Sequence, residues 1–270
     1  MADYILQLED ISKFFGPVIA LNGVTLRLQR GEVHCLLGDN GAGKSTLIKT
    51  LAGVHAPEQG RYLVDGVPVR FRSPREALDA GIATVYQDLA LVPLMSVARN
   101  FFMGREPRKK LWGVVPVMDH EAAARTAMER LGEMGIRVRD ADQMVGNMSG
   151  GEKQCLAIAR AIHFGARVLI LDEPTAALGV KQSGNVLKLV SRARDRGISV
   201  IFITHNVNHA YPVADSFTLL NRGQSMGSFA KADISKEAVL DMMAGGAEMK
   251  KVMAELEGTG GPADVAVGVN

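Results

Sequence analysis

The sequence predicts an α/β fold, in which a parallel sheet with crossover helices carries an antiparallel β portion and an inserted helical subdomain. Two observations support this prediction. Strand-like apolar runs alternate with helical patterns near both ends of the chain, at 31–53 and 167–205, which is typical of a parallel sheet. Residues 88–165 are mostly helical in pattern and interrupt that alternation. We therefore expect them to form an insertion into the core.

Other stretches predict antiparallel strands. Residues 3–30 alternate apolar and polar side chains, which is the period of half-buried strands. Residues 60–71 alternate again around Asp65-Gly66, a hairpin turn signal, and residues 216–229 ("SFTLLNRGQSMGSF") indicate a second hairpin. Both hairpins are expected to extend the sheets.

The short stretch "SPREALDAG" predicts a helix with Ser73 as its N-cap and Glu76 completing a capping box. We expect one domain over residues 1–245, with the helical subdomain at about 89–165. The Gly-rich residues 246–270 are expected to be a flexible tail.

Composition indicates a globular protein without a broad charged footprint. Of 270 residues, 47% are hydrophobic and 22% charged, and the net charge of +2 does not favour nucleic acid as a partner. Cys35 and Cys155 lie in apolar contexts and are expected to be buried. The N-terminus does not resemble a signal peptide, and no apolar run approaches the ~20 residues that span a bilayer. We expect a cytosolic chain that works at a membrane only if another protein holds it there.

The stretch "GDNGAGKST", residues 38–46, fits the phosphate-loop pattern between a predicted strand and a predicted helix. Its glycines would let backbone N–H groups point at phosphates, and Lys44 would reach the terminal phosphates. Ser45 would place its hydroxyl on Mg²⁺. The loop residues expected to bind nucleotide are Gly38, Asn40, Gly41, Gly43, Lys44, Ser45 and Thr46.

Two carboxylates follow the apolar run "VLIL" near the end of the chain. A phosphate-loop protein needs an acid near its metal, and Asp172 at a strand end would supply it. Glu173 would then polarise the attacking water as a general base. The alternative is that both are solvated loop acids, which the phosphate loop upstream makes the weaker interpretation.

A second Gly-rich stretch, "NMSGGEKQ", precedes a predicted helix. Ser149 and Glu152 would form an ordinary capping box, but two glycines in a first helical turn are costly. Gly150 and Gly151 would let an anion approach the helix N-terminus. Because the phosphate loop already covers the phosphates of one nucleotide, this second site would serve a nucleotide bound by another copy of the chain.

These motifs, in the order phosphate loop, "MSGGE", "VLILDEPTAAL" and "ITH", resemble the ATP-binding subunit of an ABC transporter. Ser149 lies 24 residues before Glu173 and His205 lies 32 residues after it, in agreement with that family. The resemblance implies a P-loop, RecA-like core that binds ATP and Mg²⁺. It also implies a head-to-tail dimer, in which Ser149, Gly150 and Gly151 of one copy complete the γ-phosphate site of the other.

The resemblance assigns further roles to single residues. Phe15 resembles the aromatic residue that stacks on adenine, although it could equally be a strand core residue. Gln87 resembles the glutamine that ligates the metal and senses the membrane partner, and His205 resembles the histidine that contacts the γ-phosphate. Their alternatives are a polar residue at a strand end and a helix cap. Residues 89–103 would border a groove for a permease helix, although much of that stripe would be core.

The stretch from Arg70 to Glu106 resembles the ATP subunits of simple-sugar importers of the ribose, fructose and inositol type. That implies peripheral attachment to the cytoplasmic face of the membrane through a permease, with a periplasmic or extracellular sugar-binding protein as an indirect partner. The chain departs from the family at Met148 and Glu152, and more strongly at Gly179, where an aspartate is common. The alternatives are another ABC transporter class, or a soluble P-loop ATPase or kinase.

Overall fold

The computed structural model describes residues 3–244, and its centre is a six-stranded sheet in the order β12-β11-β3-β10-β9-β6. Strands β11, β3, β10, β9 and β6 are parallel, and β12 pairs antiparallel with β11 at one edge. The strands are β3 (Val33–Leu37), β6 (Ile82–Val85), β9 (Val168–Asp172), β10 (Ser199–Thr204), β11 (Ser216–Asn221) and β12 (Gln224–Ala230). The predicted parallel sheet is confirmed.

The central strands are buried along their whole length. Every residue of β3 and β10 is buried, as are the first four of β9. Continuous apolar strands of this kind occur in parallel sheets whose two faces are both covered by other elements. Because crossover helices supply that cover, the alternation of strand and helix patterns in the sequence predicted the sheet correctly.

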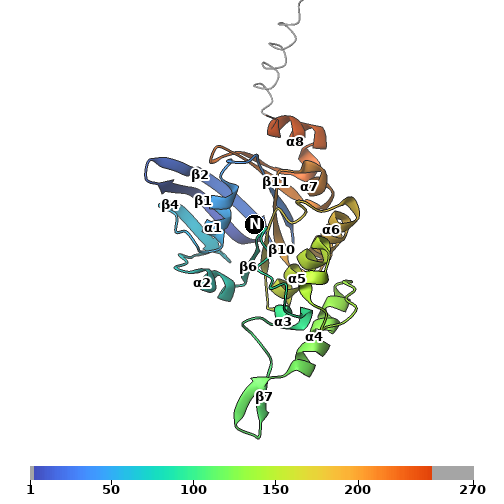
Figure 1. The fold of residues 1–270 in the computed structure, drawn as a ribbon. Helices are drawn as coiled ribbons and strands as arrows, with labels where there is room; N and C mark the ends of the chain where they lie inside the picture. Colours follow the sequence, from blue (N-terminus) through green and yellow to red (C-terminus); the bar gives the residue numbers. More distant parts are fainter. Residues whose placement is uncertain (1–2, 245–270) are drawn as a thin grey trace, which may run out of the picture.

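A second, antiparallel sheet has the order β2-β1-β4-β5 and packs on the first together with α1 (Figure 1). Asp65 and Gly66 both have positive φ, of 52° and 76°, as a two-residue hairpin turn requires. Its strands are β1 (Tyr4–Phe15), β2 (Val18–Gln29), β4 (Gln59–Val64) and β5 (Val67–Pro68). Both predicted hairpins are therefore confirmed.

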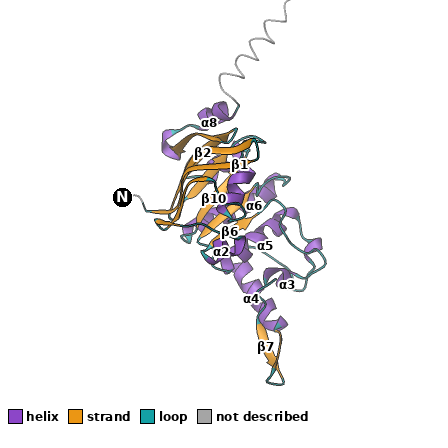
Figure 2. Ribbon diagram, turned by 90° about the vertical axis from the view of Figure 1, so that its left-hand side faces the viewer, coloured by secondary structure: helices purple, strands orange, loops and turns teal. Residues whose placement is uncertain are grey.

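Helices flank the central sheet, and α3 to α5 gather at one end of the molecule (Figures 1 and 2). The Ser73 cap is confirmed, because Ser73 Oγ accepts from Glu76 N at 3.4 Å, but the Glu76 carboxylate accepts from Arg72 N rather than from Ser73 N. The helices are α1 (Lys44–Leu51), α2 (Pro74–Asp79), α3 (Val97–Phe101), α4 (His120–Glu133), α5 (Gly150–His163), α6 (Val180–Asp195), α7 (Val207–Val213) and α8 (Lys236–Met243), with 3₁₀ turns at Val145–Asn147 and Lys231–Asp233.

The helical stretch contains one element that the sequence did not predict. Strands β7 (Arg108–Leu111) and β8 (Val115–Met118) form a hairpin between α3 and α4. The division into one domain over 1–245 with a subdomain at about 89–165 stays a prediction. The flexible tail predicted for 246–270 lies outside the described residues. Between residues 3 and 244, none of the helices has the length and apolar character needed to cross a membrane.

Both cysteines are buried, as predicted. Burial raises the pKa of the Cys155 thiol to about 11 and raises that of Cys35 further. Both therefore act as small core residues rather than as reactive thiols.

Candidate functional site

The phosphate-loop residues lie at the edge of the central sheet where β3, β9 and β10 end, the usual ligand-binding edge of parallel sheets. A cavity of about 520 Å³ opens there. Of the sequence-predicted site residues, those that line it are Asn40, Gly41, Gly43, Lys44, Ser45, Thr46, Gln87, Asp172 and Glu173. The structure thus brings together residues that are up to 133 positions apart in the chain, from Asn40 to Glu173.

Glycine is required at two positions of the loop. Gly43 has φ 101°, and a Cβ there would lie 2.9 Å from the carbonyl oxygen of Ala20. A Cβ on Gly38 would collide with the carbonyl oxygen of Leu220. The loop therefore passes close to neighbouring backbone on two sides, and side chains would displace it.

Lys44 is held inside the loop. Its side chain is buried, and Nζ donates to the carbonyl oxygens of Gly38 at 2.5 Å and Asp39 at 3.0 Å. Lys44 is also the first residue of α1, so its ammonium group and the positive end of a helix face the same cavity. Both features favour an anion there.

Asp172 ends β9 and is half-buried at the cavity wall. Burial raises the pKa of its carboxyl group, the neighbouring charge of Glu173 raises it further, and Lys44 opposes both. The negative charge on Asp172 is thus stabilised less than in water, and a bound cation would relieve that cost.

Glu173 is fixed by the end of β10. Its Oε2 accepts from Thr204 Oγ1 at 2.8 Å, and its Oε1 accepts from His205 N at 3.0 Å. The side chain is 12% exposed, so the alternative of a solvated loop acid is wrong for Glu173. Its backbone has φ 46°, a left-handed conformation that is uncommon for a non-glycine residue and is found at functional sites. Thr204 is a site residue that the sequence did not single out.

Three oxygen-bearing side chains line the cavity as candidate metal ligands: the hydroxyl of Ser45, the amide of Gln87 and the carboxylate of Asp172. Mg²⁺ prefers such hard oxygen ligands, usually one or two carboxylates completed by phosphates and water. Within residues 3–244, no three His, Cys, Asp or Glu side chains gather into a self-sufficient metal cluster. The donor set therefore fits a metal that arrives with a phosphate ligand.

Ser149 forms the predicted capping box of α5. Its Oγ accepts from Glu152 N at 3.3 Å, and Glu152 Oε2 accepts from Ser149 N at 2.7 Å. A Cβ on Gly150 would lie 2.9 Å from Leu178 Cδ2, and one on Gly151 would lie 2.9 Å from Gln182 Cβ. The glycines thus also allow α5 to pack closely against the first turn of α6 and the residues just before it.

The second glycine pair is not brought to the phosphate loop of its own chain. Ser149 and Gly151 line a different cavity of about 670 Å³, which shares no lining residue with the phosphate-loop cavity. Lys181, Lys188, Arg192 and Arg137 also line it, so this cavity is basic. Within this chain, Ser149 and the phosphate loop therefore belong to separate cavities.

The residues assigned by resemblance take different positions. Gln87 follows β6 and lines the phosphate-loop cavity, whereas Phe15 does not. Phe15 is 44% exposed at the end of β1, with its ring 5.2 Å from that of His55, so the alternative of a core residue is wrong. Its stacking role stays a prediction. His205 is exposed after β10, and its ring nitrogen Nδ1 lies 2.7 Å from Glu173 Oε1.

Gly179 is the N-cap of α6 and has an ordinary extended conformation, with φ −69° and ψ 163°. A Cβ there would meet nothing within 4 Å. Neither backbone strain nor close packing requires glycine at this position, so an acid would fit.

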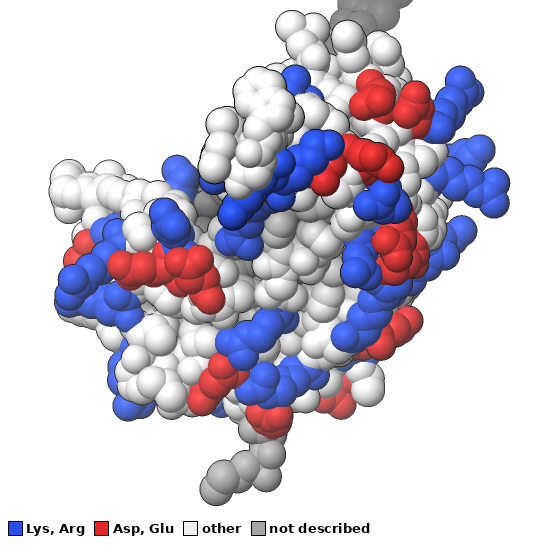
Figure 3. Space-filling view, turned by 90° about the horizontal axis from the view of Figure 1, so that it is seen from below, with Lys and Arg blue, Asp and Glu red and all other residues white. Residues whose placement is uncertain are grey.

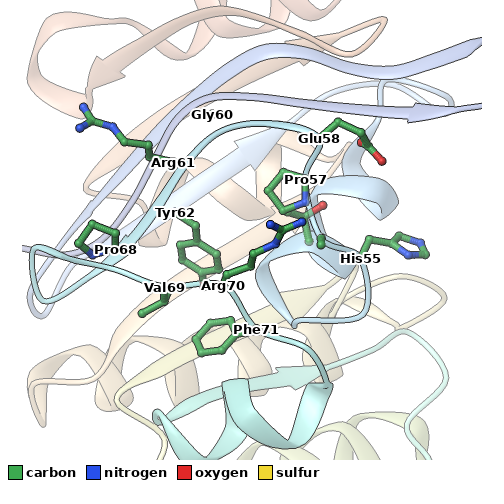
Figure 4. A pocket seen from close by; sticks show the side chains of 12 residues that line it. His55, Pro57, Glu58, Gly60, Arg61, Tyr62, Pro68, Val69, Arg70 and Phe71 are labelled. Atoms are coloured by element: carbon green, nitrogen blue, oxygen red, sulfur yellow. The ribbon is translucent and has the colours of Figure 1, made fainter.

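A further cavity of about 230 Å³ lies beside β4 and β5, lined by His55, Glu58, Arg61, Tyr62, Arg70 and Phe71 among others (Figure 4). It contains none of the predicted site residues. Tyr62 donates to Leu51 O at 3.1 Å and Glu58 pairs with Lys13, so two of its polar groups serve the fold. The nucleotide chemistry belongs to the phosphate-loop cavity.

Comparison with known proteins agrees with this site. The model of the ABC transporter family matches residues 21–176. The chain is 40% identical over 239 residues to the xylose/arabinose import ATP-binding protein XylG of Sulfolobus acidocaldarius, covering 88% of this chain and 93% of that protein. It is 41% identical over 249 residues to the fructose import ATP-binding protein FrcA of Rhizobium meliloti, covering 90% and 95%.

Other relatives are longer. The chain is 38% identical over 244 residues to a putative ribose/galactose/methyl galactoside import ATP-binding protein of Burkholderia lata, covering 90% of this chain but 45% of that protein. It thus spans about half the length of several curated relatives that it matches.

Solved structures share the fold. CbiO1 of Clostridium perfringens, described as part of an ABC transporter complex, matches with TM-score 0.74 and 28% identity over 96% of this chain and 98% of that one. An ATP-binding cassette of an ABC transporter in its ADP conformation matches with TM-score 0.75 and 25% identity, covering 89% and 95%. The predicted RecA-like core with its antiparallel and helical additions is confirmed, and the chain belongs to the ABC transporter family as one of its ATP-hydrolysing, nucleotide-binding subunits.

Proposed function

We propose that this subunit hydrolyses MgATP in a head-to-tail dimer and thereby powers the import of a simple sugar through a partner permease. The observation that carries the proposal is the arrangement around Glu173, a carboxylate fixed at the end of β10 in the same cavity as the phosphate loop. A kinase or a nucleotide-gated scaffold has no need for an acid held in this way beside the acid that faces the metal.

The chain's own residues divide the chemistry among them. Backbone N–H groups of the loop and Lys44 bind the β- and γ-phosphates. Ser45, Gln87 and Asp172 would hold Mg²⁺, which supplies electrostatic stabilisation of the charge on the phosphates. Glu173 accepts a proton from the attacking water, and Thr204 and the backbone of His205 keep its carboxylate oriented toward that water.

The dimer proposal rests on the separation of the two cavities. Ser149 and Gly151 line a basic cavity apart from the phosphate loop, with Gly150 between them in the first turn of α5. A second copy turned head to tail would present its own nucleotide to this helix N-terminus. The Nε2 atom of His205, the ring nitrogen that does not contact Glu173, would contact the γ-phosphate. Phe15 would stack on adenine.

The contact with a permease is proposed for the loop after Gln87. Leu94 is 82% exposed and Val92 38% exposed, although both belong to an ordered segment. Asn100, fully buried, holds that segment by accepting from Val92 N and donating to the carbonyl oxygens of Val92 and Met95. A fixed loop that exposes large apolar side chains is typical of a docking surface. Through it the subunit would sit at the cytoplasmic face of the membrane.

The sugar assignment rests on the names of the relatives, which import xylose/arabinose, fructose or ribose/galactose. We expect affinity purification from native membranes to recover a permease with this subunit. A periplasmic or extracellular sugar-binding protein should join that complex from the other side of the membrane. ATP turnover in proteoliposomes of the complex should rise with one simple sugar and its binding protein. Turnover that responds to another solute class would replace the sugar assignment with another ABC transporter class.

A further inference from the structure

The β7–β8 hairpin projects from the helical end of the molecule, beyond α3 and α4 (Figures 1 and 2). Its turn carries large apolar side chains that are strongly exposed. Trp112 is 86% exposed and Val114 77% exposed, and Leu111 and Val115 beside them are exposed by 42% and 45%. An isolated two-stranded hairpin is only marginally stable, and side chains that stay exposed do not stabilise it through burial.

Trp112 is also unfavourable in its backbone conformation. Trp112 and Gly113 have φ 49° and 79°, the two positive values of a tight hairpin turn. Asn, Asp and Gly accept the first of these positions, whereas a bulky side chain is an outlier there. A tryptophan that is strained in the turn and unburied by the fold points to a contact outside the chain.

The hairpin has two unlike faces. From the strand register, Leu111, Val115 and Val117 share one face with Lys109 at its base, where Lys109 Nζ lies 3.6 Å from Asp119 Oδ1. Arg108 and Lys110 lie on the opposite face. Figure 3 looks onto this end of the molecule, where Lys and Arg side chains lie directly against uncharged ones. An apolar tip is thus combined with three exposed cations within one short element, and one of them, Lys109, is paired with Asp119.

We propose that this hairpin binds the surface of an anionic lipid bilayer, with Trp112 and Val114 in the headgroup region and Arg108 and Lys110 near the lipid phosphates. Tryptophan prefers the membrane–water interface, and basic residues beside an apolar tip add attraction to anionic lipids. The tip is a narrow projection. A protein partner would need a complementary pocket to bind it, whereas a fluid lipid bilayer would not. The net charge of +2 is compatible with this contact because the contact is local.

This inference relies on the proposed function only in that a permease would keep the subunit near a membrane. The lipid contact itself needs neither permease nor ATP. It can therefore be tested on the full chain alone, and a failure of the transport proposal would not hide its result.

The chain contains a single tryptophan, so its fluorescence reports on the hairpin tip alone. The full chain is mixed with vesicles of phosphatidylcholine containing one third phosphatidylglycerol, and separately with pure phosphatidylcholine. We expect a shift of the emission maximum to shorter wavelength with the anionic vesicles, weakened by salt. Unchanged emission with them would overturn the proposal. A shift seen only when purified permease is reconstituted would also overturn it, in favour of a protein partner.

Vesicle flotation of variants completes the test. Replacing both Arg108 and Lys110 by Gln should weaken vesicle binding roughly 25-fold, at about fivefold for each charge. The matched control replaces Arg75 and Arg125, which are exposed on α2 and α4, by Gln and should bind as the wild type does. Trp112→Asn should lose vesicle binding while it raises the melting temperature, because Asn fits the turn. Equal binding by this variant would contradict the proposal.

Discussion

His205 and Glu173, 32 residues apart in the sequence, meet where the central sheet ends, with His205 Nδ1 2.7 Å from Glu173 Oε1. The imidazole is 56% exposed to solvent, whereas the carboxylate, which lines the phosphate-loop cavity, is only 12% exposed. The backbone N–H of His205 donates to the same oxygen at 3.0 Å. His205 therefore orients Glu173 through two groups. A side-chain substitution removes the imidazole contact but leaves the hydrogen bond from the backbone N–H.

His205→Ala should lower the rate of ATP hydrolysis at least about tenfold, because the ring that contacts Glu173 and would contact the γ-phosphate is lost. ATP affinity should change much less, because the phosphate loop is left intact. Steady-state kinetics together with nucleotide-binding titration separate the two effects. His120→Ala, at the exposed start of α4, is the control and should behave as the wild type. A parallel loss of affinity and rate would show that His205 acts mainly in binding.

Lys44→Ala should weaken nucleotide binding by about tenfold to a hundredfold, because charge-assisted hydrogen bonds to phosphate are lost. Isothermal titration with ATP measures this directly. Lys49→Ala serves as the matched control, since Lys49 lies on the same helix but is exposed and does not line the cavity. Wild-type affinity in the Lys44 variant would exclude the phosphate role.

Asp172→Asn should make the protein more stable than the wild type at neutral pH in the absence of metal and nucleotide. Folding raises the pKa of the Asp172 carboxyl group. At pH values between the ordinary pKa and this raised pKa, the folded protein therefore binds more protons than the unfolded chain. The wild type therefore loses stability as pH rises through that interval, and the advantage of the variant should grow from about pH 4 to pH 7.

Urea denaturation at both pH values measures this advantage, and Asp142→Asn, at an exposed loop acid, is the control. The rate of ATP hydrolysis by Asp172→Asn should be far below that of the wild type at every Mg²⁺ concentration. A pH-independent stability difference would exclude the burial cost that we assign to Asp172.

Gly179→Asp should fold and melt roughly 1–3 °C higher, because an aspartate at a helix N-cap adds a hydrogen bond and a favourable charge. The position has cap-like dihedral angles and open space for the side chain. Gly179→Asn is the matched control, since it caps α6 without adding charge. We expect the Hill coefficient for ATP to change in the aspartate variant and not in the asparagine variant. Equal coefficients in all three proteins would remove Gly179 from any communication between sites.

Much of this architecture follows from local sequence patterns. A few consecutive residues suffice to predict the apolar strands, the phosphate loop and the acids after "VLIL". The structure brings the loop and the acids together in one cavity. The β7–β8 hairpin was not predicted because "RKKL" has no apolar alternation, and within residues 3–244 its strands pair only with each other.

The contacts of Thr204 could not be read from the sequence for a different reason. They exist because β10 lies beside β9, so that the ends of two strands share one edge. Phe15 is exposed at the last position of β1, so its exposure follows from where the strand ends and not from the alternation of its residues.

The central claim is that two copies of this chain enclose ATP and that Glu173 carries the hydrolytic step. It is tested most directly with Glu173→Gln, by light scattering on a gel-filtration column in ATP and Mg²⁺ together with phosphate release, and with Glu129→Gln on α4 as the control. We expect the variant to bind ATP, to elute as a dimer, and to lose about 10²- to 10⁴-fold in hydrolysis rate. A Glu173→Gln protein that stays monomeric with ATP and hydrolyses it at the wild-type rate would contradict the account.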